Sequence, residues 1–365
     1  MSTNGTNNSL EKPKNIPISG LVFFGRRDRV KSMNCYIERN MVDNGGWLDE
    51  VLWVVNTKNH EDLKYFEEII ASSPRYKKLD IGRYVRAADY RQIWKLLQRE
   101  TIYVKIDDDV LWLADDTIPL LVNHKVKHPN DFAVSANVIN NPPLGFMHYH
   151  FGALHPYFPE LDSGKPSQKI SDNKSWKWSD HPYWEGPEDF EWSSTANPPA
   201  KGHRWLRVKQ DKALARTPAT QLKYEVWGTS YYSWAITAQQ HYSFLENLET
   251  DQLHLYKFDP PWNMDNERIK INVLAIWSDD ILDSDIDNWP AAKSDEDMIV
   301  MELPKRYYRR ERNDLILAVN ILGQALAVHF SYQHQPAVED TDLLDRYHSL
   351  ALERGCIRKK INANV

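Results

Sequence analysis

The stretch YVKIDDDVLWL, residues 103–113, places three consecutive carboxylates between two apolar and aromatic runs that predict strand. Repulsion among Asp107, Asp108 and Asp109 raises carboxyl pKa values and destabilises the fold unless a cation or strong hydrogen-bond donors compensate it. Alternate side chains of a strand share a face, so Asp107 and Asp109 are expected to point together and Asp108 away from them. The pattern favours a divalent metal held by Asp107 and Asp109.

Strand-like and helix-like segments alternate along the chain before this stretch. Apolar runs without alternation predict buried strands, and apolar residues at helical spacing predict helices. The strands are predicted at residues 19–25, 50–57 and 76–82, and the helices at residues 27–41, 60–70 and 90–100. This order predicts a mostly parallel sheet with helices on its faces. Such sheets bind ligands at the carboxyl ends of their strands, which is where the acidic triplet is expected to lie.

The second half of the chain has a different texture. Further strands are predicted at residues 132–140, 271–277 and 325–332, and helices at residues 230–250 and 342–355. Between them, residues 148–217 are rich in His, Pro, Trp and Gly and show little periodicity, which is typical of functional loops. Flat aromatic faces suit sugars and apolar ligands. The candidate substrate contacts are Trp184, Trp205, Trp227 and His148.

Composition limits the partners that the chain is expected to have. A net charge of -6 argues against nucleic acid as the main ligand. No run of eighteen apolar residues predicts a membrane span, and the polar N-terminus lacks the apolar core of a signal peptide. Cys35 and Cys356 lie far apart in sequence, which favours a reducing compartment and no disulfide framework. These features together predict a cytoplasmic protein that acts on small molecules.

The acidic triplet resembles the DxD motif of GT-A glycosyltransferases, which hold the diphosphate of a nucleotide sugar through a divalent metal. A wider likeness, spread over residues 18–350, is to a group of filamentous-fungal glycosyltransferase-like proteins. It is carried by FFGRRDRV, NGGWLDEVLWVVNT, YVKIDDDVLWL, VSANVINNPP, WAITAQQHYSFLENLE, NERIKINVLAIWSDD and AVHFSY. The resemblance implies a GT-A-like (Rossmann-like) α/β fold, with a mixed, mostly parallel sheet flanked by helices. It also implies a single domain with a long irregular, aromatic-rich insertion.

The resemblance also gives approximate boundaries. Residues 1–17 form a polar tail that is expected to be disordered, and residues 18–340 form the catalytic domain. Within that domain, residues 18–147 are expected to bind nucleotide and metal, and residues 148–340 the acceptor. Residues 341–365 are expected to form a C-terminal helix and tail.

The resemblance implies roles for individual side chains. Asp107, Asp109 and His329, which lies in a late predicted strand, are the expected ligands of Mn²⁺ or Mg²⁺. An arginine after the first strand would pair with a diphosphate as a bidentate donor. The expected nucleotide contacts are Phe24, Gly25, Arg26, Arg27, Asn56, Thr57, Asp89, Asp107 and Asp108, with a helix N-cap as the simpler role of Asp89.

A catalytic base is needed if the sugar is transferred with inversion of configuration. A carboxylate near the anomeric carbon fills this role, whereas transfer with retention needs no such base. Asp279 and Asp280 follow the predicted strand 271–277, where inverting GT-A enzymes often place their base, and Asp265 and Glu267 precede it. The sequence does not decide between the two stereochemical outcomes.

The expected function is metal-dependent transfer of a sugar, of the hexosyltransferase type, from a nucleotide-diphosphate donor. A UDP-sugar is the first expectation and GDP-mannose the second, with a small molecule or a glycan as acceptor. One alternative is a nucleotidyltransferase that makes such donors, although FFGRRDRV has one glycine where those enzymes carry a glycine-rich loop. Another is a non-catalytic sugar- or nucleotide-binding protein of the same fold.

Overall fold

The fold is described by a computed structural model covering residues 10–82, 89–161, 175–192, 196–306, 308–309, 314–315 and 318–357. The strands are β1 (Ile18–Phe24), β2 (Glu50–Val55), β3 (Tyr76–Leu79), β4 (Ile102–Ile106), β5 (Val110–Leu113), β6 (Ala133–Ile139), β7 (Tyr157–Pro159), β8 (Trp205–Arg207), β9 (Trp262–Asn263), β10 (Val273–Trp277), β11 (Tyr308–Arg309), β12 (Asp314–Leu315) and β13 (Asn320–His329). The helices are α1 (Arg27–Arg39), α2 (His60–Ser72), α3 (Arg91–Trp94), α4 (Thr117–Lys127), α5 (Pro142–His150), α6 (Thr229–Tyr232), α7 (Trp234–Glu249), α8 (Ser278–Leu282), α9 (Asp295–Asp297), α10 (Leu303–Arg306) and α11 (Leu343–Leu350).

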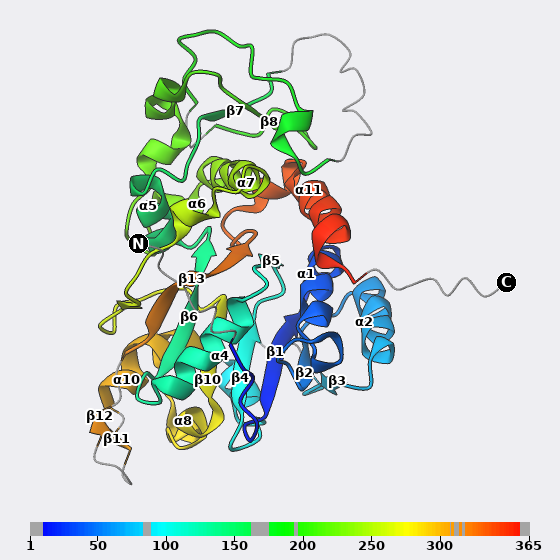
Figure 1. The fold of residues 1–365 in the computed structure, drawn as a ribbon, viewed down its shortest axis with the longest axis vertical. Coiled ribbons are helices and arrows are strands. Elements are labelled where there is room, and N and C mark those ends of the chain that lie inside the picture. Colours follow the sequence, from blue (N-terminus) through cyan, green and yellow to red (C-terminus); the bar gives the residue numbers. More distant parts are fainter. Residues whose placement is uncertain are drawn as a thin grey trace, which may run out of the picture.

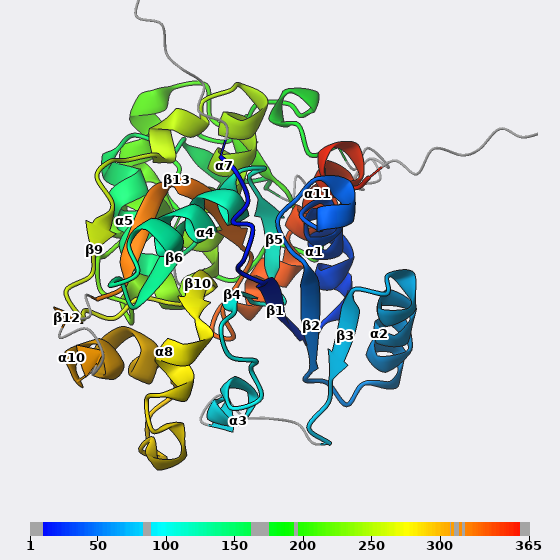
Figure 2. The ribbon, with the colours of Figure 1, turned by 60° about the horizontal axis from the view of Figure 1, so that its bottom comes forward.

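One nine-stranded sheet organises the molecule, in the order β3-β2-β1-β4-β10-β6-β13-β5, with β9 paired to β13 (Figures 1 and 2). Strands β1 to β4 are mutually parallel, and β6 and β13 run in the same direction as they do. Only β10, β5 and β9 run against them in this sheet, as the described residues pair. Helix α2 flanks β3 at one edge, and α4 packs on β4, β10, β6 and β13. The predicted fold class is confirmed.

The central strands form because their residues are mostly apolar on both faces. All seven residues of β1 and all seven of β6 are buried, as parallel strands covered by helices on each side require. The predicted segments 19–25, 50–57 and 132–140 are therefore confirmed as strands. Helix α2 begins at a side-chain cap, because Asn59 accepts hydrogen bonds from the backbone amides of Glu61 and Asp62.

The stretch 103–113 is not one strand. Strand β4 ends at Ile106, the three aspartates form a turn, and β5 begins at Val110 and pairs with β13 rather than with β4. The expectation that Asp107 and Asp109 share a strand face is therefore wrong, because strand alternation does not apply in a turn. The helix predicted at residues 90–100 is likewise reduced to the single turn α3.

Strand β10 is antiparallel to its neighbours, with Val273 opposite Ile106 and Trp277 opposite Ile102. Its carboxyl end consequently lies at the opposite edge of the sheet from the carboxyl end of β4. A sequence pattern identifies a buried strand but carries no record of its direction. This one reversal decides where the residues after β10 are placed.

The aromatic-rich region packs as a separate layer above α7 (Figure 1). Strands β7 and β8 pair there, and Phe158, Trp184, Leu206, Val208 and Ala213 form a small hydrophobic cluster. Every position of α7 from Trp234 to Asn247 is buried, so this helix is enclosed on all sides rather than along one stripe. No helix among the described residues is long and apolar enough to cross a membrane.

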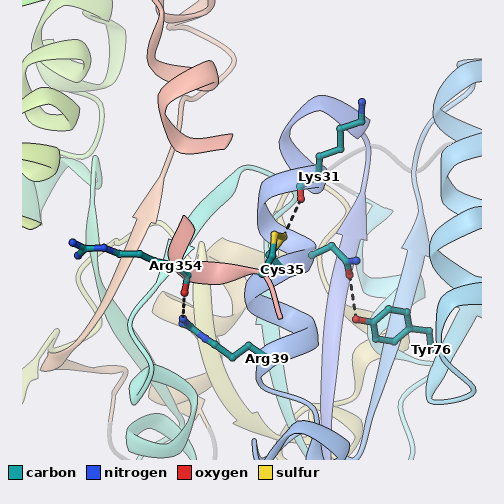
Figure 3. The surroundings of a disulfide bond; sticks show 7 residues. Lys31, Cys35, Arg39, Tyr76 and Arg354 are labelled. Atoms are coloured by element: carbon teal, nitrogen blue, oxygen red, sulfur yellow. Dashed lines mark hydrogen bonds between the residues drawn. A yellow bond between two sulfur atoms is a disulfide. The ribbon is translucent and has the colours of Figure 1, made fainter. Parts of the chain in front are cut away.

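A disulfide joins Cys35 in α1 to Cys356, 321 residues later (Figure 3). The expectation of unlinked cysteines is wrong, because distance along the sequence does not measure distance in the fold. Helix α11 lies beside α1, and Arg39 Nη1 donates a hydrogen bond of 3.3 Å to the Arg354 carbonyl next to the bridge. Disulfides are typical of oxidising compartments, so the cysteines do not support the inference of a reducing one.

The Cys356→Ser variant is expected to lower the free energy of unfolding by about 2 to 4 kcal/mol, because the bridge restricts the unfolded chain over a very long loop. Chemical denaturation without reductant would measure this loss. Adding reductant should bring the wild type to the level of the variant and leave the variant unchanged. Equal denaturation midpoints for the wild type with and without reductant would contradict the prediction.

Candidate functional site

A cavity of about 1130 Å³ opens at the carboxyl ends of β1, β2 and β4. Parallel strands ending together leave a crevice there, which is the usual ligand site of open α/β sheets. The N-terminal half contributes residues that directly follow these strands, and the C-terminal half contributes the opposite wall. The lining segments are 23–26, 56–58, 105–109, 268–272, 294–297 and 329–333 in part, with Tyr90, Trp227, Tyr231 and Ala292.

Asp109 is the most enclosed of the three aspartates, with 8% of its side chain exposed. Its Oδ2 atom lies 2.8 Å from Arg26 Nη2, 3.4 Å from Arg29 Nη1 and 3.3 Å from His329 Nε2. Burial alone would raise the pKa of Asp109, but His329 and the two arginines outweigh it and hold this pKa well below its usual range. Asp109 is thus an anion that is contacted by Arg26 just before α1, by Arg29 in α1 and by His329 at the end of β13.

Asp108 is bound by the same arginine. Arg26 Nε donates to Asp108 Oδ2 at 3.0 Å, and Nη2 donates to Oδ1, which makes a bidentate pair. Burial raises the pKa of Asp108 although Arg26 opposes the rise. A Cβ atom at Gly25 would lie 2.6 Å from Asp108 Oδ2, so any other residue there would displace the Asp108 carboxylate from its present position.

Asp107 has a different set of partners. Lys105 Nζ lies 2.5 Å from Oδ1, and Asn272 Nδ2 donates to Oδ2 at 3.3 Å. Lys105 is itself fixed by the carbonyl of Ile271 at 2.6 Å. Burial raises the pKa of Asp107 to about 6, against the opposing charge of Lys105 and with the help of the neighbouring Asp109. The Tyr332 hydroxyl donates to Asn272 Oδ1 at 3.2 Å and so extends this chain of contacts.

The types of side chain around the acidic turn are suitable ligands for a divalent metal. Two carboxylates and a neutral imidazole are ligands that Mn²⁺ accepts, and His329 Nδ1 is buried with no hydrogen-bond partner among the described residues. No three Asp, Glu, His or Cys side chains in the described ranges are spaced as a ready-made metal site. Instead, Arg26, Arg29 and Lys105 contact the carboxylates of Asp107 and Asp109. The residues therefore fit a metal that displaces some of these cations.

The opposite wall holds a lysine among aromatic rings. Lys270 Nζ lies 3.7 Å from the ring centre of Trp227, 4.8 Å from that of Tyr231 and 5.8 Å from that of Tyr332. Glu296 Oε1 accepts hydrogen bonds from Lys270 at 3.2 Å and from Arg268 at 2.6 Å. Trp227 is 49% exposed, so part of its indole surface is free to meet a ligand.

Most residues of this wall were missed by sequence reasoning. Arg268 and Lys270 alternate with apolar residues just before β10, and residues 294–297 read SDED, a second acidic run. That alternation before a buried strand was the available signal. Asp295 within the acidic run is buried, accepts a hydrogen bond from Trp94 Nε1 at 3.0 Å and has a pKa raised by burial.

The structure brings one group of the predicted residues together at the cavity: Gly25, Arg26, Asn56, Thr57, Asp107, Asp108, Asp109, Trp227 and His329. Three predicted nucleotide contacts do not line it. Phe24 points into the core against Trp53 and Phe66, and the preceding Phe23 lines the cavity instead. Arg27 is paired with Glu61 on the surface, and Asp89 is also outside the lining.

The four predicted bases do not line the cavity. Asp279 accepts hydrogen bonds from Arg99 and from the Glu100 amide, and Asp280 is buried beside Lys125 at 3.1 Å. Both follow β10, whose antiparallel direction carries them to the far edge of the sheet. Asp265 and Glu267 are exposed in the loop between β9 and β10. None of the four is among the residues that line this cavity.

Three of the four predicted substrate contacts are packing residues. Trp184 and Trp205 are buried among other aromatic side chains, with Trp205 donating through Nε1 to His203 Nε2 at 3.3 Å. His148 is 1% exposed, lies 4.9 Å from the Tyr256 ring and shares a 2.8 Å hydrogen bond between its Nε2 and Asn137 Oδ1. Aromatic composition alone does not separate a pocket wall from a core.

Comparison with known proteins adds little beyond the architecture. No protein-family model matches the chain, and none of the curated proteins matches it. A mannosyltransferase from Pyrobaculum calidifontis, in complex with GDP-Man and Mn²⁺, is 19% identical over 35% of this chain and 39% of its own, with a TM-score of 0.27. GalNAc-T7 with UDP, GalNAc and Mn²⁺ is 10% identical over 87% of this chain and 44% of its own, with a TM-score of 0.41.

A third similar structure is the 4-diphosphocytidyl-2C-methyl-D-erythritol synthase of Anaerococcus prevotii, 12% identical over 41% of this chain and 60% of its own, with a TM-score of 0.27. The chain thus spans between 39% and 60% of the length of these three proteins. At these identities and TM-scores the similarities say nothing about what this chain binds. Its function has to be argued from the site.

A structural role for His148 predicts a pH effect on stability. Burial lowers its pKa to about 3, whereas an unfolded histidine titrates near pH 6.5. The unfolded chain then takes up the proton first, so this stabilisation is complete above about pH 6.5. It is lost as the pH falls, by about 1.4 kcal/mol per pH unit. His148→Gln should reduce the acid slope of the denaturation midpoint without affecting ligand binding.

The slope should fall in part rather than vanish, because burial lowers the pKa of His241 to about 3 and also lowers the pKa values of His181 and His203. His150→Gln is the matched control, since His150 is exposed at the end of the same helix. Identical pH profiles for the His148 and His150 variants would count against the structural role.

Proposed function

We propose that this protein is a metal-dependent glycosyltransferase that takes a sugar from a nucleoside-diphosphate donor. The carrying observation is the enclosed Asp107–Asp109 turn beside His329, whose Nε2 lies 3.3 Å from Asp109 Oδ2. Carboxylates and an imidazole at the carboxyl ends of parallel strands suit a divalent ion and a diphosphate. Asp107, Asp109 and His329 would hold Mn²⁺ or Mg²⁺, which would supply Lewis-acid stabilisation of the departing diphosphate.

The nucleoside is expected beside β1 and β2. The Phe23 and Tyr90 rings both line the cavity there, with centroids 4.9 Å apart, and Asn56 Nδ2 donates to the Tyr90 hydroxyl at 3.3 Å. Aromatic faces beside amide groups suit a base and ribose. Thr57 lies next to them on the same wall. We retain a UDP-sugar as the first donor to test and GDP-mannose as the second.

The sugar and its acceptor are expected on the wall formed by Trp227, Tyr231, Lys270 and Tyr332. The C–H faces of a sugar stack on an exposed indole, and charged neighbours bind hydroxyl groups. A small molecule or a glycan is the proposed acceptor. Asp295, Glu296 and Asp297 are the acids on this wall among the described residues, so a base for inverting transfer is to be sought among them.

A second candidate is a nucleotide-binding protein without catalysis. It is favoured by one observation, namely that Arg26, Arg29 and Lys105 already compensate the three carboxylates without a metal. Such a protein would bind nucleotide equally well with and without a divalent ion. Metal dependence of nucleotide binding therefore separates the two candidates.

The wild type is expected to gain thermal stability with UDP or GDP only when Mn²⁺ is present, because a ligand that binds only the folded state stabilises it by mass action. Asp109→Asn should abolish this gain, because it removes the charge that a metal would meet. Thermal-shift titrations with UDP, GDP and CMP, each with and without Mn²⁺, make the measurement.

Asp116→Asn is the matched control, because Asp116 is an exposed aspartate seven residues further along the chain. It should leave the Mn²⁺-dependent shift intact. An undiminished shift in the Asp109 variant would remove this residue from the site. A shift of equal size with and without Mn²⁺ would instead favour the non-catalytic candidate.

Trp227→Ala is expected to weaken binding of the intact nucleotide sugar by about tenfold, roughly the value of one aromatic stacking contact. It should leave the affinity for the free nucleotide unchanged. Calorimetric titration with UDP-glucose, UDP-N-acetylglucosamine and GDP-mannose, against UDP and GDP, measures the difference. Tyr183→Ala is the control, because Tyr183 is 39% exposed and lies outside the cavity lining. Equal losses for nucleotide and nucleotide sugar would contradict stacking of the sugar.

A further inference from the structure

The three carboxylates of the β4–β5 turn are neutralised within the protein itself. Arg26 spans Asp108 and Asp109, Arg29 reaches Asp109, and Lys105 binds Asp107. Three negative charges therefore face three positive ones. A divalent ion added to this arrangement would meet a site whose charge is already balanced, so one of the cations has to withdraw before the ion is well bound.

Of the three cations, Arg26 is the one that is free to leave. Its side chain is 40% exposed and precedes the first turn of α1, whereas the side chains of Arg29 and Lys105 are 2% and 5% exposed. Arg29 is also held by Glu339 and lies 5.1 Å from the ring centre of Phe330. Lys105 is fixed by a backbone carbonyl at 2.6 Å. Moving either of these two would disturb a buried cation, whereas Arg26 is the exposed partner in its pairs with Asp108 and Asp109.

Arg26 is also placed to receive a diphosphate. It lines the cavity next to Thr57 and Lys58, at the strand ends where the nucleotide is proposed to bind. A guanidinium that forms a bidentate pair with one carboxylate can form the same pair with a phosphate, since both present two oxygens in one plane. The Arg26 guanidinium, which neutralises the charge of the aspartates, can therefore neutralise the charge of the diphosphate instead.

We propose that Arg26 is an internal counter-ion which a divalent metal replaces, and that the released guanidinium then pairs with the diphosphate. This inference rests on the proposed function. The charge of the site stays balanced in this exchange only if both the metal and the diphosphate bind. Metal alone would have to displace Arg26 without a new anion to receive it, and diphosphate alone would meet three carboxylates. Arg26 thereby couples the two binding events, so that each ligand raises the affinity for the other.

The test uses the full chain and measures Mn²⁺ binding through the electron paramagnetic resonance signal of the free ion, so it needs no catalytic turnover. In the wild type, UDP or GDP should raise the affinity for Mn²⁺ by about 5- to 150-fold, the usual range of a coupled pair. In Arg26→Gln, Mn²⁺ without nucleotide should bind more tightly than it does to the wild type. The nucleotide in saturating Mn²⁺ should bind more weakly, and the coupling should shrink towards one.

Arg27→Gln is the matched control, because this neighbouring arginine pairs with Glu61 on the surface and does not line the cavity. It should leave both affinities and their coupling unchanged. Arg26→Lys is the second variant, should the glutamine variant fail to fold. Lysine keeps the charge but does not span two carboxylates, so Mn²⁺ alone should again bind more tightly than to the wild type.

The inference is overturned if Mn²⁺ alone binds the Arg26 variants no more tightly than the wild type. It is also overturned if Arg26→Gln couples Mn²⁺ and nucleotide binding as strongly as the wild type does, an outcome that leaves the proposed function standing. If the wild type binds Mn²⁺ and nucleotide independently, the inference and the proposed function both fail. If the wild type binds no nucleotide with or without Mn²⁺, the proposed function fails and the inference falls with it.

Discussion

The acidic turn between β4 and β5 is the constraint on which the rest of the site depends. Three carboxylates at one enclosed point require positive charge, and the chain supplies it from two segments that are far apart in sequence. Arg26 and Arg29 come from the start of α1 and Lys105 from β4, and the imidazole of His329, at the end of β13, adds a contact to Asp109. Glu339 pairs with Arg29, so the segment after β13 is also held close to the acidic turn. Charge compensation thus ties both ends of the chain to the centre of the sheet.

Helix α1 links the acidic turn to the outer layer of the molecule. Its first turns present arginines to the acidic turn, and its last turns carry Cys35 and Arg39, which contact the C-terminal segment. Tyr76 Oη donates at 3.1 Å to Asn34 Oδ1 on the face towards β3 (Figure 3). The helix is therefore fixed along its whole length. A firmly held helix keeps Arg29 in place while the exposed side chain of Arg26 keeps room to move.

Sequence reasoning predicted the half of the site that is local in the chain. Residues directly after β1, β2 and β4 reach the cavity because parallel strands end at one edge, and a strand end can be read from the loss of apolar character. Sequence reasoning failed where the direction of a strand, or the choice of which residues pair, depends on the whole fold. The antiparallel course of β10 moved Asp279 and Asp280 away, and the disulfide leaves no local pattern. Burial of Trp205 and His148 is likewise decided by packing that composition does not describe.

The charges of the cavity explain why two ligands would be needed together. Five lysine or arginine side chains and six aspartate or glutamate side chains line it, a formal balance of one negative charge with histidine neutral. A diphosphate alone would therefore enter a cavity of its own sign, beside three clustered carboxylates. A divalent ion reverses that balance to one positive charge and makes the same cavity attractive to the anion. Arg26 contacts both Asp108 and Asp109, so its pairing with them is the first contact that a bound divalent ion would change.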